Sequence, residues 1–275
     1  MNYLKTGLIM VLMAAIFLAV GALLGGKSGL VMALFISLAF NFGMYWFGAN
    51  LALSFARARP LEPHEAPWLV QANEEICRKA GIPTVPLYLS PDPQPNAFAC
   101  GRGPGAASIC VNAGLLNNMS QREVIGVLAH EIAHVKNRDT LTMTIIAAMA
   151  SAIMFLSRFA LFFGSNDRQG GNALAEILLF ILGPIAAMLI QLWVSRVREF
   201  EADKTAALLL GDPHPLADAL ETLERGTQAI PAHTGDPAVA HMYIANPFSG
   251  RGLAALFSTH PPIEERVRRL RSMAV

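Results

Sequence analysis

His130 and His134 stand four positions apart, and Glu131 directly follows the first histidine. Successive residues of an α-helix are rotated by about 100°, so side chains at positions i and i+4 project from the same face. Two imidazole groups in this arrangement can bind one Zn²⁺ ion, and Glu131 is then placed to act on a metal-bound water. The pattern predicts a metal-dependent hydrolytic site. The alternative interpretation is a solvated helix that carries these three side chains without a metal.

A catalytic zinc ion needs a third protein ligand and one open position for water. The apolar stretch that begins at Leu141 starts seven residues after His134, which is about 10 Å along a helix. Glu199 comes five residues after Val194, the end of the next apolar stretch, which is about 7–8 Å. If these two stretches form a membrane hairpin, both side chains lie at a similar height above the membrane, on helices continuous with the spans. Glu199 is therefore the favoured third ligand. The other candidates are carboxylates and the remaining histidines: His64, His214, His233, His241 and His260.

Asp203 lies four positions after Glu199 and therefore on the same helix face. A carboxylate there can accept the free N–H of a ligating histidine and hold the ring in one tautomer. The alternative interpretation of these two residues is a solvated acidic turn that follows a membrane helix.

The composition indicates an integral membrane protein. Of the 275 residues, 53% are hydrophobic and only 15% are charged, whereas a soluble domain carries about 25% charged residues. A transmembrane helix needs roughly 20 predominantly apolar residues. Four stretches meet this requirement and predict two helical hairpins: residues 6–26 with 28–56, and residues 141–163 with 173–194.

The positions of lysine and arginine predict the orientation of these spans. Residues on one side of the membrane are far richer in positive charge, and the positive-inside rule places this side in the cytoplasm, with Tyr45 and Trp46 at its interface. The cytoplasmic residues are Lys5, Arg57, Arg59, Lys136, Arg138, Arg196 and Arg198; those on the opposite side are Lys27 and Arg168.

The chain is thus predicted to be a mainly α integral membrane protein with four transmembrane helices and a cytosolic α+β domain that contains a small β-sheet. The expected division is a transmembrane hairpin, a cytosolic part with the His-Glu-x-x-His helix, a second hairpin, and a cytosolic helical part that contains Glu199. These parts are residues 1–56, 57–140, 141–194 and 195–275.

Local signals place several elements of the cytosolic parts. A helix is predicted over residues 66–80, with Gly81 at its C-terminal end. Ser120 and Glu123 form a capping-box pattern that starts the His-Glu-x-x-His helix. Three strands are expected where apolar runs are bounded by proline, aspartate or glycine: residues 85–90, 96–101 and 106–112.

Net charge and cysteine content exclude further classes. The net charge of +1 gives no basis for a nucleic-acid partner. The three cysteines are odd in number and lack metal-ligand spacing, so they are expected to be reduced packing residues: Cys77, Cys100 and Cys110.

Four motifs in combination resemble the HtpX-type membrane zinc metalloproteases, which are similar to the CAAX prenyl endopeptidases and belong with the gluzincins. They are His-Glu-Ile-Ala-His-Val-Lys-Asn-Arg-Asp at 130–139, Ser-Arg-Val-Arg-Glu-Phe-Glu-Ala-Asp at 195–203, Asn-Pro-Phe-Ser-Gly at 246–250 and Ser-Thr-His-Pro-Pro at 258–262. The resemblance covers nearly the whole chain. It implies a zincin-like catalytic domain with one zinc ion per chain, held by His130, His134 and Glu199, and Glu131 as the catalytic base.

The same resemblance implies further roles. His260 and Arg266 are expected to face the substrate and to stabilise the oxyanion of the tetrahedral intermediate. The segment that contains Asn96, Ala97 and Phe98 resembles the edge strand beside the cleft, along which an extended peptide would bind through its main chain. The expected partners are polypeptides, chiefly misfolded membrane proteins, and the lipid bilayer. The expected setting is the bacterial inner membrane, with the site facing the cytoplasm, in protein quality control and stress response.

Three other interpretations remain beside this one. An intramembrane site-two-type protease also carries the pentad, but the charged residues Lys136 and Arg138 place this pentad outside the bilayer. A CAAX-type prenyl endopeptidase would share the site and differ in substrate. A membrane scaffold or holdase with a structural zinc ion would bind the metal without needing Glu131.

Overall fold

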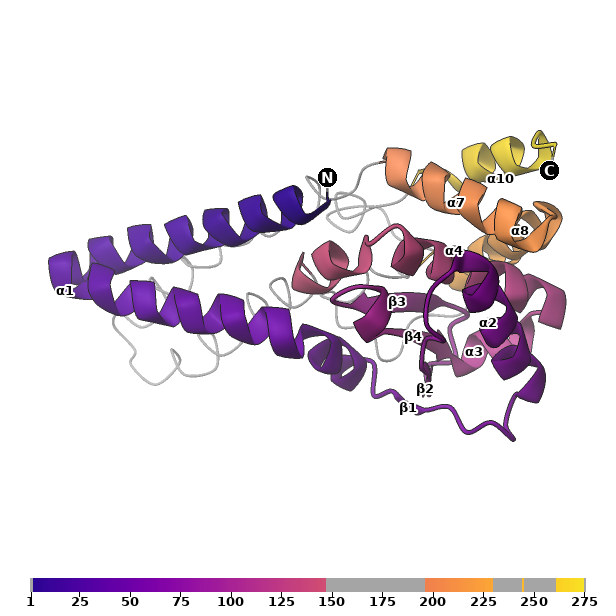
Figure 1. The fold of residues 1–275 in the computed structure, drawn as a ribbon, viewed down its shortest axis with the longest axis horizontal. Coiled ribbons are helices and arrows are strands. Elements are labelled where there is room, and N and C mark those ends of the chain that lie inside the picture. Colours follow the sequence, from indigo (N-terminus) through magenta and orange to yellow (C-terminus); the bar gives the residue numbers. More distant parts are fainter. Residues whose placement is uncertain (1, 147–195, 230–243, 245–260, 275) are drawn as a thin grey trace.

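A long helical hairpin projects from one end of the molecule, and a small sheet covered by helices forms the other end (Figure 1). The structure, a computed structural model, describes residues 2–146, 196–229, 244 and 261–274. The hairpin is α1 (Asn2–Phe55), whose two arms meet at Gly26, a glycine with a φ of 57°. This left-handed conformation is readily adopted by glycine because it has no Cβ atom.

The second arm of the hairpin has the character of a membrane span. Among the described helices, the stretch Gly25–Phe55 alone is long and apolar enough to cross a bilayer. The predicted third and fourth spans fall mostly within residues 147–195, outside the described part of the chain. Four spans therefore stay a prediction.

The sheet has four strands in the order β1-β2-β4-β3. β2 (Leu87–Ser90) runs parallel to β4 (Ala107–Asn112), whereas β1 (Arg59–Pro60) and β3 (Ala97–Gly101) are antiparallel to their neighbours. The three strands expected from the sequence are confirmed to within two residues at each end; the short β1 was not expected. β3 is an edge strand of this sheet.

The side chains of β3 point alternately into two cores. Ala97 and Ala99 belong to the main core beneath the helices, while Phe98 and Cys100 pack on the opposite face against the last turns of α1, including Ala52. The hairpin and the sheet thus share one packed interface.

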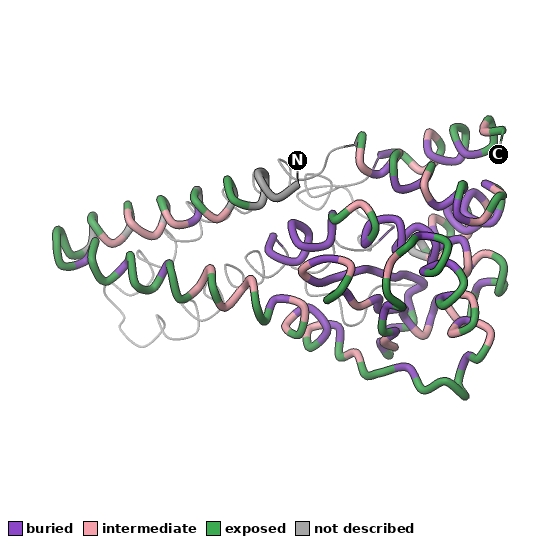
Figure 2. The backbone as a smooth tube through the Cα atoms, viewed as in Figure 1, coloured by how far each residue is buried: buried purple, intermediate pink, exposed green. Residues whose placement is uncertain are grey.

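α4 (Gln121–Lys136) runs through the centre of the helical layer and is buried along most of its length (Figure 2). It packs against helices from both parts of the sequence. These are α2 (Pro67–Ala80), α7 (Arg196–Leu210) and α8 (His214–Ala229), with α3 (Ala113–Asn118) and α10 (Ile263–Arg271) completing the layer.

The predicted start of α4 is confirmed, because Ser120 and Glu123 form a complete capping box. Glu123 also accepts a hydrogen bond of 2.6 Å from the hydroxyl of Thr222 in α8. Burial alone would raise the pKa of Glu123, but the hydrogen bonds from Thr222 and Ser120 outweigh this effect and lower it. The capping carboxylate therefore also joins α4 to α8.

The end of α4 differs from the expectation. α4 stops at Lys136, Arg138 has a φ of 60°, and a separate helix begins at Thr140. The prediction of one helix continuous from the pentad into the third span was therefore wrong. An arginine with positive φ is a strained conformation that interrupts the helical hydrogen bonds.

The expected state of the cysteines is confirmed within the structure, since all three are buried and none is in a disulfide. Burial raises the pKa of the Cys100 thiol to about 12, with a smaller contribution from the charge of Glu131. This thiol is an inert packing group.

Candidate metal centre

Two side chains of α4 and one of α7 converge in the helical layer that covers the sheet. His130 Nε2 lies 3.1 Å from His134 Nε2, and the two nitrogens lie 3.6 Å and 3.5 Å from the carboxylate oxygens of Glu199. All three residues are buried, and in the described part of the chain they form the one group of this kind able to hold a metal ion.

The spacing of these donors fits a tetrahedral metal. Zinc bonds of about 2.0–2.1 Å imply distances of about 3.3–3.4 Å between neighbouring ligand atoms. The three observed distances between donors run from 3.1 to 3.6 Å. Two neutral imidazoles and one carboxylate also form a donor set typical of catalytic zinc, which leaves a fourth position open.

Asp203 holds the outer nitrogen of the first histidine. Its carboxylate lies 3.0 Å from His130 Nδ1, on the ring side away from the cluster. Burial by itself lowers the pKa of His130, but hydrogen bonds to Asp203 and Glu199 raise it to about 9. The carboxylates of Asp203 and Glu199 therefore favour positive charge beside this ring, and a metal ion bound by the neutral imidazole would supply that charge in place of the proton.

Arg266 of α10 fixes Asp203 in turn. The guanidinium donates two hydrogen bonds to the carboxylate, of 2.9 Å from Nε and 2.7 Å from Nη2, and the side chain is 0% exposed. Its Nη1 lies 3.6 Å from Glu199 and donates to the carbonyl of Ile244 at 3.3 Å. A chain of contacts thus runs from Arg266 through Asp203 to His130.

The second histidine has an equivalent partner that the sequence analysis did not single out. His134 Nδ1 lies 3.2 Å from Asp139, which is 2% exposed, and Arg198 lies 3.8 Å from the other carboxylate oxygen. On an unbroken helix, residues five positions apart point about 140° away from each other. The break after Lys136 returns Asp139 to His134, and Asn137 as a helix-ending residue is the sequence signal that could have revealed it.

Replacing Asp139 with alanine is expected to weaken metal binding by about 10- to 100-fold, because the His134 ring loses the acceptor that orients it. Competition with a chelator of known affinity would measure this change in the purified chain. The metal affinity of Asp139→Asn should lie between those of the natural chain and Asp139→Ala, since the amide oxygen of asparagine can still accept the N–H of His134.

Asp218→Ala is the matched control, because Asp218 is a partly exposed carboxylate that forms ion pairs with two surface arginines, Arg122 and Arg271. Equal metal affinity in Asp139→Ala and Asp218→Ala would show that Asp139 does not support the site.

Glu131 follows His130 on α4 and is 1% exposed. Its charge contributes to raising the pKa of Arg266 in α10 and of Cys100 in β3. The carboxylate is therefore within electrostatic range of both the edge strand and the arginine beside the cluster.

Ala97 and Phe98 begin β3 at the edge of the sheet, and Asn96 directly precedes them. The backbone carbonyl of Asn96 accepts a hydrogen bond from the N–H of Asn112 in β4. The backbone groups of the next residue, Ala97, therefore point away from β4. The carbonyl of Ala97 accepts a hydrogen bond of 3.3 Å from the N–H of Ile244, and the N–H of Gly101 donates to the Thr144 hydroxyl at 2.9 Å. His260, the other expected substrate-facing residue, lies outside the described residues.

The fold and the cluster define a metal-dependent peptidase built around a His-Glu-x-x-His helix. A model of peptidase family M48 matches residues 63–274, and the chain belongs to this family.

Relatives extend the match to the full length. The protease HtpX homolog of Pyrococcus abyssi is 45% identical over 278 residues, covering 99% of this chain and 96% of the relative. That of Persephonella marina is 46% identical over 282 residues, covering 100% and 98%. The expected similarity to the HtpX-type proteases is confirmed, and the chain is a membrane metalloprotease.

A solved structure shares the fold. The crystal structure of S. mikatae Ste24p matches with a TM-score of 0.51 at 20% identity. The match covers 98% of this chain, and the chain spans 65% of the length of Ste24p.

Proposed function

We propose that this chain is a zinc-dependent endopeptidase that cleaves misfolded or damaged membrane proteins at the cytoplasmic face of the bacterial inner membrane, in protein quality control under stress. The observation that carries this proposal is the buried cluster of His130, His134 and Glu199 beside an edge strand whose other face packs on the membrane hairpin. A peptide bound along that strand lies close both to the metal ligands and to the bilayer.

The chemistry assigns a role to each side chain. His130, His134 and Glu199 would hold the zinc ion, which would supply Lewis-acid activation of the scissile carbonyl and of the attacking water. Glu131 accepts the proton of the attacking water and passes it to the leaving amine. Asp203 and Asp139 hold the two histidine rings with their Nε2 atoms turned inward.

Substrate binding involves residues around this cluster. Main-chain hydrogen bonds to the outward groups of β3 hold the peptide without strong demands on its sequence, and at Ala97 and Gly101 they replace the contacts with Ile244 and Thr144. Arg266 keeps a buried positive charge beside Glu199, and this charge stabilises the oxyanion of the transition state. We assign the same task to His260.

The proposal includes the arrangement in the membrane. Residues 1–56 and 141–194 form two transmembrane hairpins, and residues 57–140 and 195–275 together form the catalytic domain in the cytoplasm. The clustering of lysine and arginine on one side of the spans supports this orientation.

The test uses the full chain in proteoliposomes that contain zinc. A membrane protein with a destabilised cytosolic loop should be cleaved at least tenfold faster than the same loop supplied as a soluble polypeptide, because both reactants are confined to one surface. Removing the metal with a chelator should stop cleavage, and added zinc should restore it.

Two results would contradict this proposal. Equal cleavage of the soluble polypeptide would remove the preference for membrane proteins. Preferred cleavage of a C-terminally prenylated peptide would favour the CAAX-type alternative instead.

A further inference from the structure

This inference rests on the proposed membrane arrangement, in which the second arm of α1 crosses the bilayer and ends on the cytoplasmic side. From the turn at Gly26 to Trp46 the second arm extends for about 30 Å, which is the thickness of the hydrocarbon core. The packing of α1 against the sheet begins just beyond this point, at Ala49. Tyr45 and Trp46, which is 47% exposed, therefore lie at the interface, where such aromatic side chains gather.

The loop that follows β3 lies at this same level. The guanidinium of Arg102 stands 4.0 Å from the ring centroid of Trp46 and 5.6 Å from that of Tyr45. Stacking on a ring orients a guanidinium and leaves the N–H groups at its edge available for an anion. Within the described residues, Arg102 forms no ion pair with a carboxylate.

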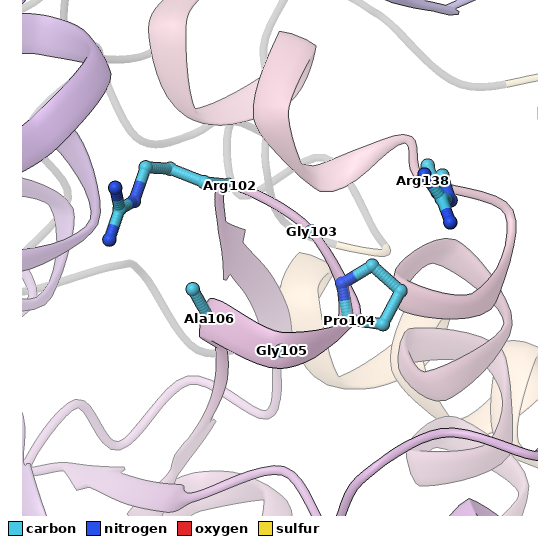
Figure 3. Close-up of a pocket in the computed structure, with 6 residues that line it drawn as sticks. All are labelled: Arg102, Gly103, Pro104, Gly105, Ala106 and Arg138. Atoms are coloured by element: carbon cyan, nitrogen blue, oxygen red, sulfur yellow. The ribbon is translucent and has the colours of Figure 1, made fainter.

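A pocket of about 430 Å³ opens at this loop, as the close-up in Figure 3 shows. Arg102 and Arg138 stand at opposite ends of its lining, and the glycine-containing loop lies between them (Figure 3). Gly103 has a φ of 148°, a conformation that L side chains rarely adopt, so the loop needs glycine here. The lining contains two arginines and no acidic residue: Arg102, Gly103, Pro104, Gly105, Ala106 and Arg138.

We propose that this pocket binds the phosphate headgroup of an anionic phospholipid from the surrounding bilayer. Arginine binds phosphate through two parallel charge-assisted hydrogen bonds. The negative surface potential of the cytoplasmic leaflet concentrates arginine-rich surfaces at this depth. A lipid is favoured over free phosphate because the stacked Trp46 fixes the pocket at the level where headgroups are abundant.

The bound headgroup would act on the edge strand, because Arg102 directly follows Gly101, the last residue of β3. Arg138 lies at the break that returns Asp139 to His134. The bound headgroup would thus connect the end of β3, through Arg102, to the membrane surface. This inference concerns lipid binding and stands apart from the metal chemistry.

The experiment titrates the full-length chain in a neutral detergent with dihexanoyl-phosphatidylglycerol below its micelle concentration. Native mass spectrometry counts the bound lipid, and tryptophan fluorescence in a variant with Trp68 and Trp193 replaced by phenylalanine follows the environment of Trp46. Binding by the double variant Arg102→Gln/Arg138→Gln should be about 10- to 100-fold weaker, since charge-assisted hydrogen bonds to the phosphate are lost. Arg78→Gln, an exposed arginine of α2, removes one charge far from the pocket and should bind as the natural chain does.

If the double variant does not fold, the single variants Arg102→Gln, Arg138→Gln and Arg102→Lys are titrated with the same lipid instead. Lysine retains the charge and loses the paired hydrogen bonds, so it should bind with intermediate affinity. Stoichiometric metal binding serves as the check of folding.

Three results would overturn the proposal. The first is equal lipid binding by the arginine variants and Arg78→Gln. The second is displacement of the lipid by inorganic phosphate at the same concentration, which would identify the pocket as a site for free anions. The third is preferential binding of an acidic peptide, which would assign the pocket to the polypeptide substrate.

Discussion

Replacing Glu131 with glutamine is expected to abolish peptide cleavage while the metal stays bound. Glutamine has nearly the same shape, but its amide cannot accept the proton of the attacking water. A positioned general base contributes about 10²- to 10⁴-fold to the rate. The three proposed ligands are His130, His134 and Glu199, so this substitution leaves the donor set complete. Single-turnover cleavage of an unfolded membrane substrate and the metal content per chain measure the two effects.

Glu74→Gln supplies the control, because Glu74 is an exposed carboxylate of α2 that lies on the surface. This variant should keep both metal and activity. Undiminished cleavage by Glu131→Gln would refute the mechanism. Absence of cleavage in the natural chain together with a firmly bound metal would support the scaffold interpretation, in which the metal is structural.

Replacing Glu199 with alanine is expected to remove most of the metal affinity. The change deletes one of three ligands and a negative charge, while the buried guanidinium of Arg266, whose Nη1 lies 3.6 Å from Glu199, continues to repel a cation. The loss should exceed the 10- to 100-fold that the removal of an outer hydrogen-bond partner costs. Metal analysis after purification in detergent, followed by titration with zinc, measures it.

Glu201→Ala is the matched control, since Glu201 is an exposed carboxylate on the same helix and points about 200° away from Glu199. Glu199→Gln preserves the size of the side chain and separates loss of metal from loss of folding. Stoichiometric zinc in Glu199→Ala would show that the third ligand is a different residue.

Much of this arrangement could be predicted because its signals are local. The capping box at Ser120 and Glu123 fixes the start of α4, and a four-residue spacing places two histidines on one face. Glu199 could be chosen by counting helix rise from the expected spans. That argument assumed that the histidine helix continues into the third span, which is wrong because α4 ends at Lys136. It nevertheless selected the residue that lies beside the two histidines.

The contacts of Asp139 and Arg266 could not be predicted, for two different reasons. Asp139 reaches His134 only through a break in the helix, so its spacing is misleading. Arg266 is one of four arginines in the last helix, and only tertiary packing makes it the one that is buried against Asp203. Local periodicity carries no information about such pairings between distant elements.

The shared core of α1 and β3 has a mechanical consequence. Phe98 and Cys100 pack on the last turns of the hairpin. The hairpin is therefore joined to the sheet by a packed interface as well as by the chain itself. A hydrophobic helix adjusts to a thinner or thicker bilayer by changing its tilt. Any such change of tilt carries the edge strand with it and reorients the catalytic cleft relative to the lipid surface. We therefore expect bilayer thickness to influence how the catalytic domain is oriented at the membrane.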